Sequence, residues 1–392
     1  MSERHTTPIA LFDPAPAVAR DRAALVAAFE AVLDSGRFVL GPAVASLEQK
    51  LGGWLGGEGE VVAVASGSDA LELGLRALGV GPGQGVITTA YSFVATAEAI
   101  VHAGARPVFA DVGPDGLLDL DALGAELDRL DRAPTGQPRL PDGTVLTALV
   151  PVHLFGAVLD GEALGRLAGR FQLHLVEDAA QALGGSSNLR AAGTLGDVGA
   201  FSFFPSKTLG AFGDGGAVWV RDRAVARRLV ALRQHGQPDR GQGPTVVGRN
   251  SRLDALQAAL LAVKLDRLAD DIAARRQQLA RYREGLAATG GAVGLVQADT
   301  PGHAGQQAVV RCERRDALGA WLAASGVTTA VYYREPLHRL IPYMNEPRLG
   351  SLARAEGLAR TTLALPLYPG LPLSQVDEVV ARVVAFVREG QP

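Results

Sequence analysis

Several residue types are scarce in this chain of 392 residues. It has one cysteine and two methionines, and aromatic residues make up 5% of the sequence. The single cysteine, Cys312, excludes an internal disulfide framework. No uninterrupted apolar run is long enough to span a membrane, and the N-terminal segment lacks the apolar core of a signal peptide. We therefore expect a cytoplasmic protein with no membrane partner.

A strong charge of one sign and the spacing of metal ligands are also missing. The formal net charge is -3 and the basic residues are scattered, so electrostatics gives no reason to expect a nucleic-acid partner. The seven histidines lie far apart, and neither an HExxH nor a CxxC pattern occurs. We expect no metal site. The length is sufficient for a large core and two domains.

Short apolar runs alternate with helical patterns over the first 220 residues. The runs are apolar on both faces, which is typical of strands covered by helices on both sides. This alternation predicts a doubly wound, mainly parallel sheet, with an antiparallel strand among the closely spaced last runs. The runs cover 61–66, 85–90, 106–112, 145–153, 171–178, 198–204 and 215–220, and the helical patterns cover 68–78, 93–103, 117–131 and 161–170.

The remainder of the chain has a different organisation. The spacing of apolar residues predicts one long helix over 251–286. Apolar runs at 293–297, 307–313 and 327–333, with helical patterns at 314–325 and 374–389, predict a small α/β unit. We expect a large domain over 1–250, a connecting helix over 251–286 and a small C-terminal domain over 287–392. The stretch 233–250 is rich in turn-forming residues and is predicted to be mobile.

Lysine is unusually rare, because only three of the 38 basic residues are lysines. Lys50 and Lys264 lie in patterns typical of solvated helix faces, whereas Lys207 lies in the aromatic, glycine-punctuated stretch 201–217. Arginine keeps its proton in proteins, but a desolvated lysine can lose it and act as a nucleophile. Lys207 is therefore a candidate nucleophile; the alternative is a surface lysine in a loop.

Three further candidate groups follow predicted strands, where open α/β sheets bind their ligands. The turn at 66–68 leads into a helix and could bind a phosphate, or could simply cap that helix. Phe93 could stack on a flat ring or pack in the core. Asp178, followed by Gln181, could hold a protonated ring nitrogen or cap a helix. With Lys207, these groups match pyridoxal 5'-phosphate, which has a phosphate, a flat ring, a basic nitrogen and an aldehyde that reacts with an amine.

Over nearly its whole length the sequence resembles the DegT/DnrJ/EryC1/StrS family of pyridoxal-phosphate-dependent sugar aminotransferases. The resemblance implies an α/β protein of PLP fold type I, aspartate aminotransferase-like, with a large, mixed, mostly parallel sheet domain and a small C-terminal α/β domain. It also implies a homodimer with shared active sites. The motifs that carry it are ASGSDAL, AYSFVATAEAI, PVHLFG, VEDAAQALGG, GAFSFFPSKTLGAFGDGGA, RQHG, GRNSRLDALQAALLAVKL, YYREPLH and LPLYPGL.

The resemblance also implies roles for single residues. Lys207 would form the Schiff base with the cofactor and shuttle a proton, and Asp178 would pair with the pyridine nitrogen. Gln181 would contact the ring hydroxyl, and Phe93 would stack on the ring. The other implied residues are Gly67, Ser68 and Ser202 at the phosphate, Asn250 reaching it from the neighbouring subunit, Arg252 at a carboxylate or as an interface arginine, and His338 with Tyr332 or Tyr333 in the sugar-nucleotide pocket.

The implied reaction moves an amino group from an amino acid, which we expect to be L-glutamate, to a nucleotide-linked keto sugar. Ser251 stands where many members have an aromatic residue, which favours a 3-keto sugar. A 4-keto sugar nucleotide and a keto-cyclitol remain alternative acceptors. A sugar 3-dehydrase is disfavoured because such relatives replace the lysine by histidine. A non-catalytic, cofactor-binding regulator is disfavoured because no DNA-binding or partner module is visible.

Overall fold

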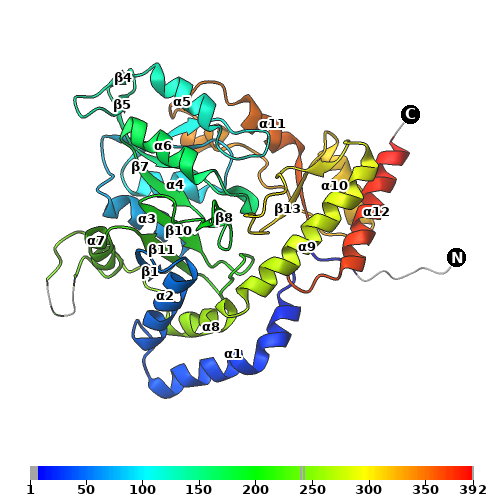
Figure 1. Cartoon of the computed structure of the whole chain (residues 1–392), viewed down its shortest axis with the longest axis horizontal. Helices are drawn as coiled ribbons and strands as arrows, with labels where there is room; N and C mark the ends of the chain where they lie inside the picture. Colours follow the sequence, from blue (N-terminus) through cyan, green and yellow to red (C-terminus); the bar gives the residue numbers. More distant parts are fainter. Residues whose placement is uncertain (1–7, 239–240, 242, 391–392) are drawn as a thin grey trace.

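Runs of valine, isoleucine and alanine form one large sheet in the computed structural model (Figure 1), which describes residues 8–238, 241 and 243–390. Part of the stretch predicted to be mobile, at 239, 240 and 242, lies outside the described residues. The strands are β1 (Glu60–Val64), β2 (Gln84–Thr89), β3 (Arg106–Ala110), β4 (Asp131–Arg132), β5 (Pro138–Arg139), β6 (Val145–Val150), β7 (His174–Asp178), β10 (Val198–Ser202), β11 (Gly216–Val220) and β14 (Arg348–Leu349).

The strand order is β1-β11-β10-β7-β6-β2-β3-β14, with β4 and β5 beside β6. Every neighbouring pair from β10 to β14 is parallel, whereas β11 is antiparallel to both β1 and β10. The predicted mixed, mostly parallel sheet and its antiparallel strand are therefore confirmed. A separate two-stranded hairpin contains β8 (Ser186–Ser187) and β9 (Arg190–Ala191).

Successive residues of a strand point to opposite sides of the sheet. Because these strands are apolar on both sides, helices cover both faces. Val86 of β2 packs in the core formed with α3 (Gly67–Ala77), α4 (Ala95–His102) and α7 (Arg223–Arg233). The next residue, Ile87, packs in the core formed with α5 (Leu120–Asp128) and α6 (Gly161–Phe171). At the β1 edge, α2 (Pro42–Trp54) and α8 (Ala255–Leu265) bury Trp219, and α1 (Ala15–Ser35) lies along α8.

The prediction of a single helix over 251–286 is wrong, because the structure has two helices there. Helix α8 ends at Leu265, and α9 (Leu268–Leu286) begins after Asp266 and Arg267. The two helices have different partners, since α8 packs on α1 and α2 whereas α9 packs on α12 (Leu373–Glu389). One straight helix could not turn its apolar residues toward both partners. The shift of the apolar stripe near Leu265 is the sequence mark of this break.

The C-terminal part contains a small antiparallel sheet of β12 (Gly294–Leu295), β13 (Ala308–Arg311) and β15 (Thr362–Leu365). Helices α9, α10 (Arg315–Ala324) and α12 pack around it. The run 327–333 does not form a strand and makes only isolated bridges, from Val327 to Ile9 and from Ala330 to Ala364 of β15. The short 3-10 helices are η1 (Leu154–Gly156), η2 (Ala287–Thr289), η3 (Leu337–Arg339) and η4 (Ile341–Tyr343).

Two segments cross the domain boundaries expected from the sequence. Ile9 packs in the core of the C-terminal part, and its backbone pairs with Val327. Conversely, β14 extends the large sheet beside β3, and α11 (Ala353–Thr361) follows it. The division at residues 250 and 286 stays a prediction.

Candidate active site

The carboxyl ends of β1, β2, β7 and β10 open on one cavity of about 490 Å³. This volume is within the range of small-molecule and cofactor sites. Most of the lining comes from the turns after these strands. The rest comes from Val152 after β6, from Asp214 and Gly215 before β11, and from two segments of the C-terminal part. Of the residues predicted from the sequence, the cavity brings together Gly67, Ser68, Phe93, Asp178, Gln181, Ser202, Lys207, Tyr332 and Tyr333.

The start of α3 forms one wall of the cavity. The Ser66 hydroxyl caps the helix by accepting the Asp69 N–H at 3.1 Å, so the alternative that this turn caps the helix also holds. A Cβ on Gly67 would lie 2.6 Å from the Ser202 Cβ, so only glycine lets β10 approach this closely. Asp69 is turned away, toward Ser251. The first N–H groups of α3 and the Ser202 side chain thus lie together, as an anion site requires.

Asp178, at the end of β7, is a buried carboxylate with few partners. Its Oδ2 accepts the Thr96 hydroxyl at 2.7 Å, and its Oδ1 accepts the Ala180 N–H at 3.2 Å. Burial raises the pKa of this carboxyl, although these hydrogen bonds and the Lys207 charge oppose the effect. A cation facing Asp178 would therefore be held strongly, because it would offset the desolvation of the carboxylate.

A buried pair behind the cavity holds the strand that carries Asp178. His153 Nε2 and Glu177 Oε2 are 2.8 Å apart, and both side chains are fully buried. The Glu177 carboxylate also accepts the N–H groups of Gly193 and Gly196, each at 2.8 Å. The N–H of Leu159 donates to His153 Nδ1. Since every carboxylate oxygen has a donor, Glu177 is fully engaged and serves to position its neighbour.

Lys207 reaches the cavity from a turn in which its N–H donates to the Phe204 carbonyl at 2.8 Å. Burial lowers the pKa of the Lys207 amine to about 8, and the Asp178 charge opposes this shift. The preceding carbonyl, of Ser206, accepts the Gln306 side-chain amide at 2.9 Å, which fixes the turn. An amine with this pKa is available as a nucleophile near neutral pH.

Aromatic side chains form the remaining wall. Phe93 is 53% exposed at the rim, so the interpretation of Phe93 as a core residue is wrong. Its ring centroid lies 6.1 Å from that of Tyr333. The Gln181 side chain accepts the Phe155 N–H at 2.7 Å and donates to the Tyr333 hydroxyl at 2.9 Å. Burial raises the pKa of the Tyr333 phenol, so this hydroxyl stays protonated at neutral pH.

Three predicted residues lie outside the cavity. Asn250 is exposed and pairs through its backbone with Gln234, and Arg252 is half-buried. Neither lines the cavity of its own protomer. His338 is fully buried, contacts Glu356 at 3.1 Å and lines a different hollow of about 640 Å³. The roles predicted for these three residues stay predictions.

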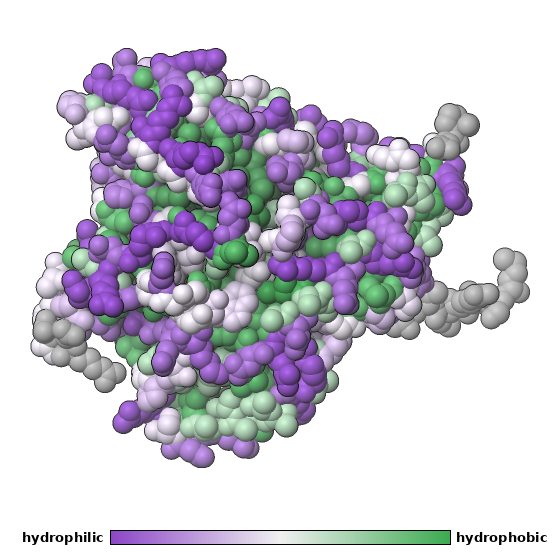
Figure 2. All heavy atoms as spheres, in the orientation of Figure 1, coloured by the Kyte–Doolittle hydropathy of each residue, from purple (hydrophilic) through white to green (hydrophobic). Residues whose placement is uncertain are grey.

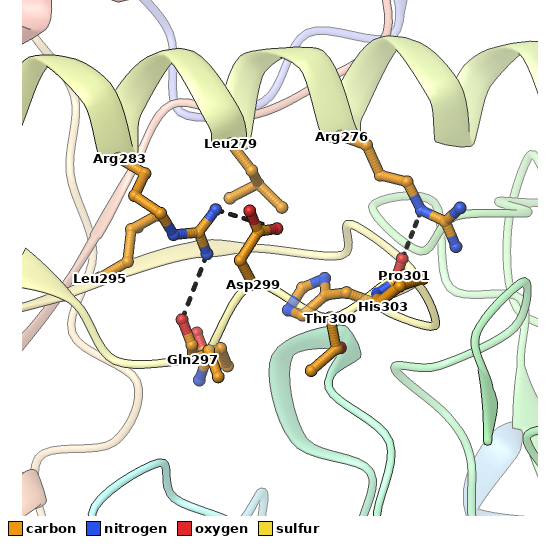
Figure 3. A pocket seen from close by; sticks show the side chains of 10 residues that line it. Arg276, Leu279, Arg283, Leu295, Gln297, Asp299, Thr300, Pro301 and His303 are labelled. Atoms are coloured by element: carbon orange, nitrogen blue, oxygen red, sulfur yellow. Dashed lines mark hydrogen bonds and ion pairs between the residues drawn. The ribbon is translucent and has the colours of Figure 1, made fainter. Parts of the chain in front are cut away.

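The hollow of about 400 Å³ beside α9 differs in chemistry from the cavity (Figure 3). Arg276 donates to the His303 carbonyl at 2.6 Å, and Arg283 pairs with Asp299 at 3.2 Å, as the dashed lines show. Its cations are engaged by the protein itself, and no lysine lines it. This hollow therefore lacks the amine nucleophile that the cavity offers.

Lys264 is a further correction, because it does not lie on a solvated helix face. The side chain is half-buried, and its amine donates to the Gly210 carbonyl. Within the described part of the chain, no group of three or more His, Cys, Asp or Glu residues gathers as a metal site. Among residues 8–238, 241 and 243–390, no helix has the length and apolarity that crossing a membrane requires.

Sequence reasoning missed Thr96 and Gln306 as site residues. Thr96 follows Ser92 by four residues, a spacing at which two hydroxyls can meet near the start of a helix. This contact could therefore have been predicted from the sequence. Gln306 has no such signal, because only the packing of the C-terminal part brings it to Ser206.

The fold and this cavity are those of an aminotransferase. The model described as the DegT/DnrJ/EryC1/StrS aminotransferase family matches residues 20–384, and the chain belongs to that family. The chain is 42% identical over 393 residues to a dTDP-3-amino-3,4,6-trideoxy-alpha-D-glucose transaminase of Streptomyces venezuelae, covering 99% of this chain and 98% of the relative.

Two further relatives are informative. A UDP-N-acetyl-3-dehydro-alpha-D-glucosamine 3-aminotransferase of Acidithiobacillus ferrooxidans is 37% identical over 360 residues, covering 91% of each chain. The crystal structure of NtdA from Bacillus subtilis with bound cofactor PMP is similar, with a TM-score of 0.86 and 26% identity. That match covers 98% of this chain and 87% of NtdA.

Proposed function

We propose that this protein is a pyridoxal-phosphate-dependent aminotransferase that moves an amino group from L-glutamate to a nucleotide-linked 3-keto sugar. The observation that carries the proposal is the meeting of the Lys207 amine and the buried Asp178 carboxylate in one cavity. When bound, pyridoxal phosphate supplies an aldehyde that reacts with an amine and a ring that accepts electrons. NtdA, a solved relative, carries PMP, the amine form of this cofactor.

The residues of the cavity fit each part of the cofactor. The N–H groups of Gly67 and Ser68 at the start of α3, with the Ser202 hydroxyl, would bind the phosphate. Asp178 would hold a proton on the ring nitrogen, because a buried carboxylate needs a positive partner. Phe93 would cover one face of the ring.

Lys207 would also move the proton during the reaction. An amine with a pKa of about 8 exchanges a proton readily near neutral pH, which suits a group that takes a proton from one carbon and returns it to another. Tyr333 and Gln181 form a hydrogen-bonded pair beside it and would orient polar groups of the ligand.

The relatives indicate the acceptor. The names of both transaminases contain a nucleotide, dTDP or UDP, and both place the amino group or the keto group at position 3 of the sugar. Ser251 after the motif asparagine agrees with this group, and its hydroxyl is buried against Asp69 at 2.7 Å. A 4-keto sugar nucleotide or a keto-cyclitol is therefore not favoured. The identity of L-glutamate as donor rests on the family resemblance, and a cytoplasmic location stays a prediction.

We further propose a homodimer with shared active sites. Apolar side chains remain exposed on α1, on the chain that follows it and beside α8: Val26, Phe29, Leu33, Phe38, Val39 and Phe212. Figure 2 shows green and pale green spheres at the lower edge of the molecule, where Figure 1 places α1. A second copy would bury this face. Asn250, outside the cavity of its own protomer, would reach the partner's cavity.

Mixed dimers test the sharing of sites. Lys207→Ala and Asn250→Ala chains with different tags are expressed together, and the mixed dimer is purified. If sites are shared, one site carries both changes and the other none, so activity returns to about half of the wild-type value. If each chain forms its own site, the mixed dimer has no more than half the activity of Asn250→Ala.

The proposed reaction is tested by a visible absorbance spectrum of the purified protein, before and after L-glutamate is added without a sugar. We expect a yellow protein whose band gives way to that of the pyridoxamine form. Nucleotide-linked 3-keto and 4-keto sugars are then compared as acceptors that restore the first spectrum. A protein that stays colourless with added pyridoxal phosphate contradicts the proposal, and a yellow protein that ignores glutamate contradicts the donor.

A further inference from the structure

Two hydroxyl groups lie in line behind the carboxylate of Asp178. The Thr96 hydroxyl is 2.7 Å from Asp178 Oδ2, and the Ser92 hydroxyl is 3.0 Å from that of Thr96. Thr96 is 1% exposed and Ser92 is 3% exposed, so water does not compete for either hydroxyl. Both residues lie in the segment between β2 and the first turn of α4, which also carries Phe93.

The direction of these hydrogen bonds follows from the number of protons available. An ionised carboxylate only accepts, so Thr96 must spend its single proton on Asp178. The oxygen of Thr96 is then left to accept the proton of Ser92. Each bond polarises the next, so the Ser92 hydroxyl strengthens the bond that Thr96 makes.

From this geometry we propose that Thr96, supported by Ser92, is a positioning residue that keeps Asp178 ionised and thereby keeps a proton on the ring nitrogen of the bound cofactor. This inference rests on the proposed function. It gives the segment at 92–96 two tasks, because Phe93 would cover the ring while Ser92 and Thr96 set the charge of its nitrogen through Asp178.

The surroundings of Asp178 single out Thr96. Burial favours the neutral carboxyl and raises its pKa, and the Thr96 hydrogen bond is the largest effect in the opposite direction. The Ala180 N–H, Lys207 and His153 contribute less. Tyr333 also faces Asp178, and its buried phenol is neutral at neutral pH. Loss of the Thr96 hydroxyl would therefore shift the proton from the ring nitrogen toward Asp178.

Thr96→Val tests the inference because valine keeps the shape of threonine and removes the hydroxyl. Thr88→Val is the matched control, since Thr88 lies on β2, is fully buried and donates to the Val150 carbonyl at 2.8 Å, away from the cavity. Thr96→Ser restores the hydroxyl, and Ser92→Ala removes the second donor. Each enzyme is saturated with pyridoxal phosphate, and its visible absorbance is titrated with pH.

In Thr96→Val we expect the titration midpoint of the visible band to rise by up to about one pH unit, since a hydrogen bond to a charged group such as Asp178 has about this strength. The visible band reports the proton on the nitrogen that would join Lys207 to the cofactor. Its midpoint rises because a ring nitrogen without its positive charge no longer repels that proton. The glutamate half-reaction should slow about tenfold. Thr96→Ser should return both values toward wild type, and Ser92→Ala should shift them in the same direction by less.

Thr88→Val should lower only thermal stability. A midpoint in Thr96→Val equal to that of Thr88→Val would overturn the inference while the proposed function stands. If Thr96→Val does not fold, an unshifted midpoint in Ser92→Ala has the same meaning. A wild-type protein that binds no pyridoxal phosphate would overturn the inference together with the proposed function.

Discussion

Lys207 and Lys264 share one electrostatic property and differ in what surrounds them. Burial lowers the pKa of each amine to about 8, and a carboxylate opposes the shift in both cases, Asp178 for Lys207 and Asp271 for Lys264. Lys264 donates to the Gly210 carbonyl and lies 5.3 Å from the centroid of the Phe212 ring. Lys207 lines the cavity, and within the described residues no hydrogen bond engages its amine.

This comparison shows that a lowered pKa indicates a desolvated amine and no more. A nucleophile also needs space for its target and freedom from competing partners. Lys264 meets neither condition, because its amine is bound to the backbone of the segment that follows Lys207. Its position makes Lys264 a brace for that segment, whereas Lys207 is the residue placed to react.

The largest expected effect separates the two lysines by activity. Lys207→Ala should lower turnover by at least about 10³-fold, since it removes both the nucleophile and the proton carrier. Lys264→Met should keep turnover within about threefold but lower the free energy of unfolding by about 1–3 kcal/mol, because the Gly210 carbonyl loses its partner. Amino transfer to a keto sugar and thermal unfolding measure the two effects. An active Lys207→Ala enzyme would contradict the assignment of Lys207 as the reacting amine.

The large sheet was predictable because its strands carry a local signal. Runs such as 145–153 and 198–204 are apolar on both faces. This pattern lies within each run, so it can be recognised without knowing which elements pack against it. The break between α8 and α9 was not predicted, since both halves have helical spacing and only their different packing partners separate them. Likewise, the run 327–333 has the composition of a strand, but the Tyr91 hydroxyl, which accepts the Tyr333 N–H, helps to hold it at the cavity instead.

The site shows the same division. Asp178 ends β7, Gly67 begins the helix after β1 and Lys207 lies in the turn after β10, so their meeting follows from the sheet alone. Gln306 comes from a segment about 100 residues away and depends on how the C-terminal part packs. Asn250 and Arg252 have no partner in the cavity of one protomer, and their roles depend on a second chain.

The smallest effect is a difference in labelling, and the chain suits the experiment because it has only three lysines. Protein freed of pyridoxal phosphate is treated with a small amine-reactive reagent at several pH values, and the peptides are quantified by mass spectrometry. Only the uncharged amine reacts, so the Lys207 rate should rise as the pH passes about 8 and level off above it. Lys264 loses its proton over the same range, yet its rate should stay lower because the Gly210 carbonyl and the Phe212 ring cover the amine. Lys50, paired with Asp266 on the surface, serves as the accessible control. Equal rates for Lys207 and Lys264 would mean that desolvation alone sets their reactivity, and the comparison between them would lose its structural basis.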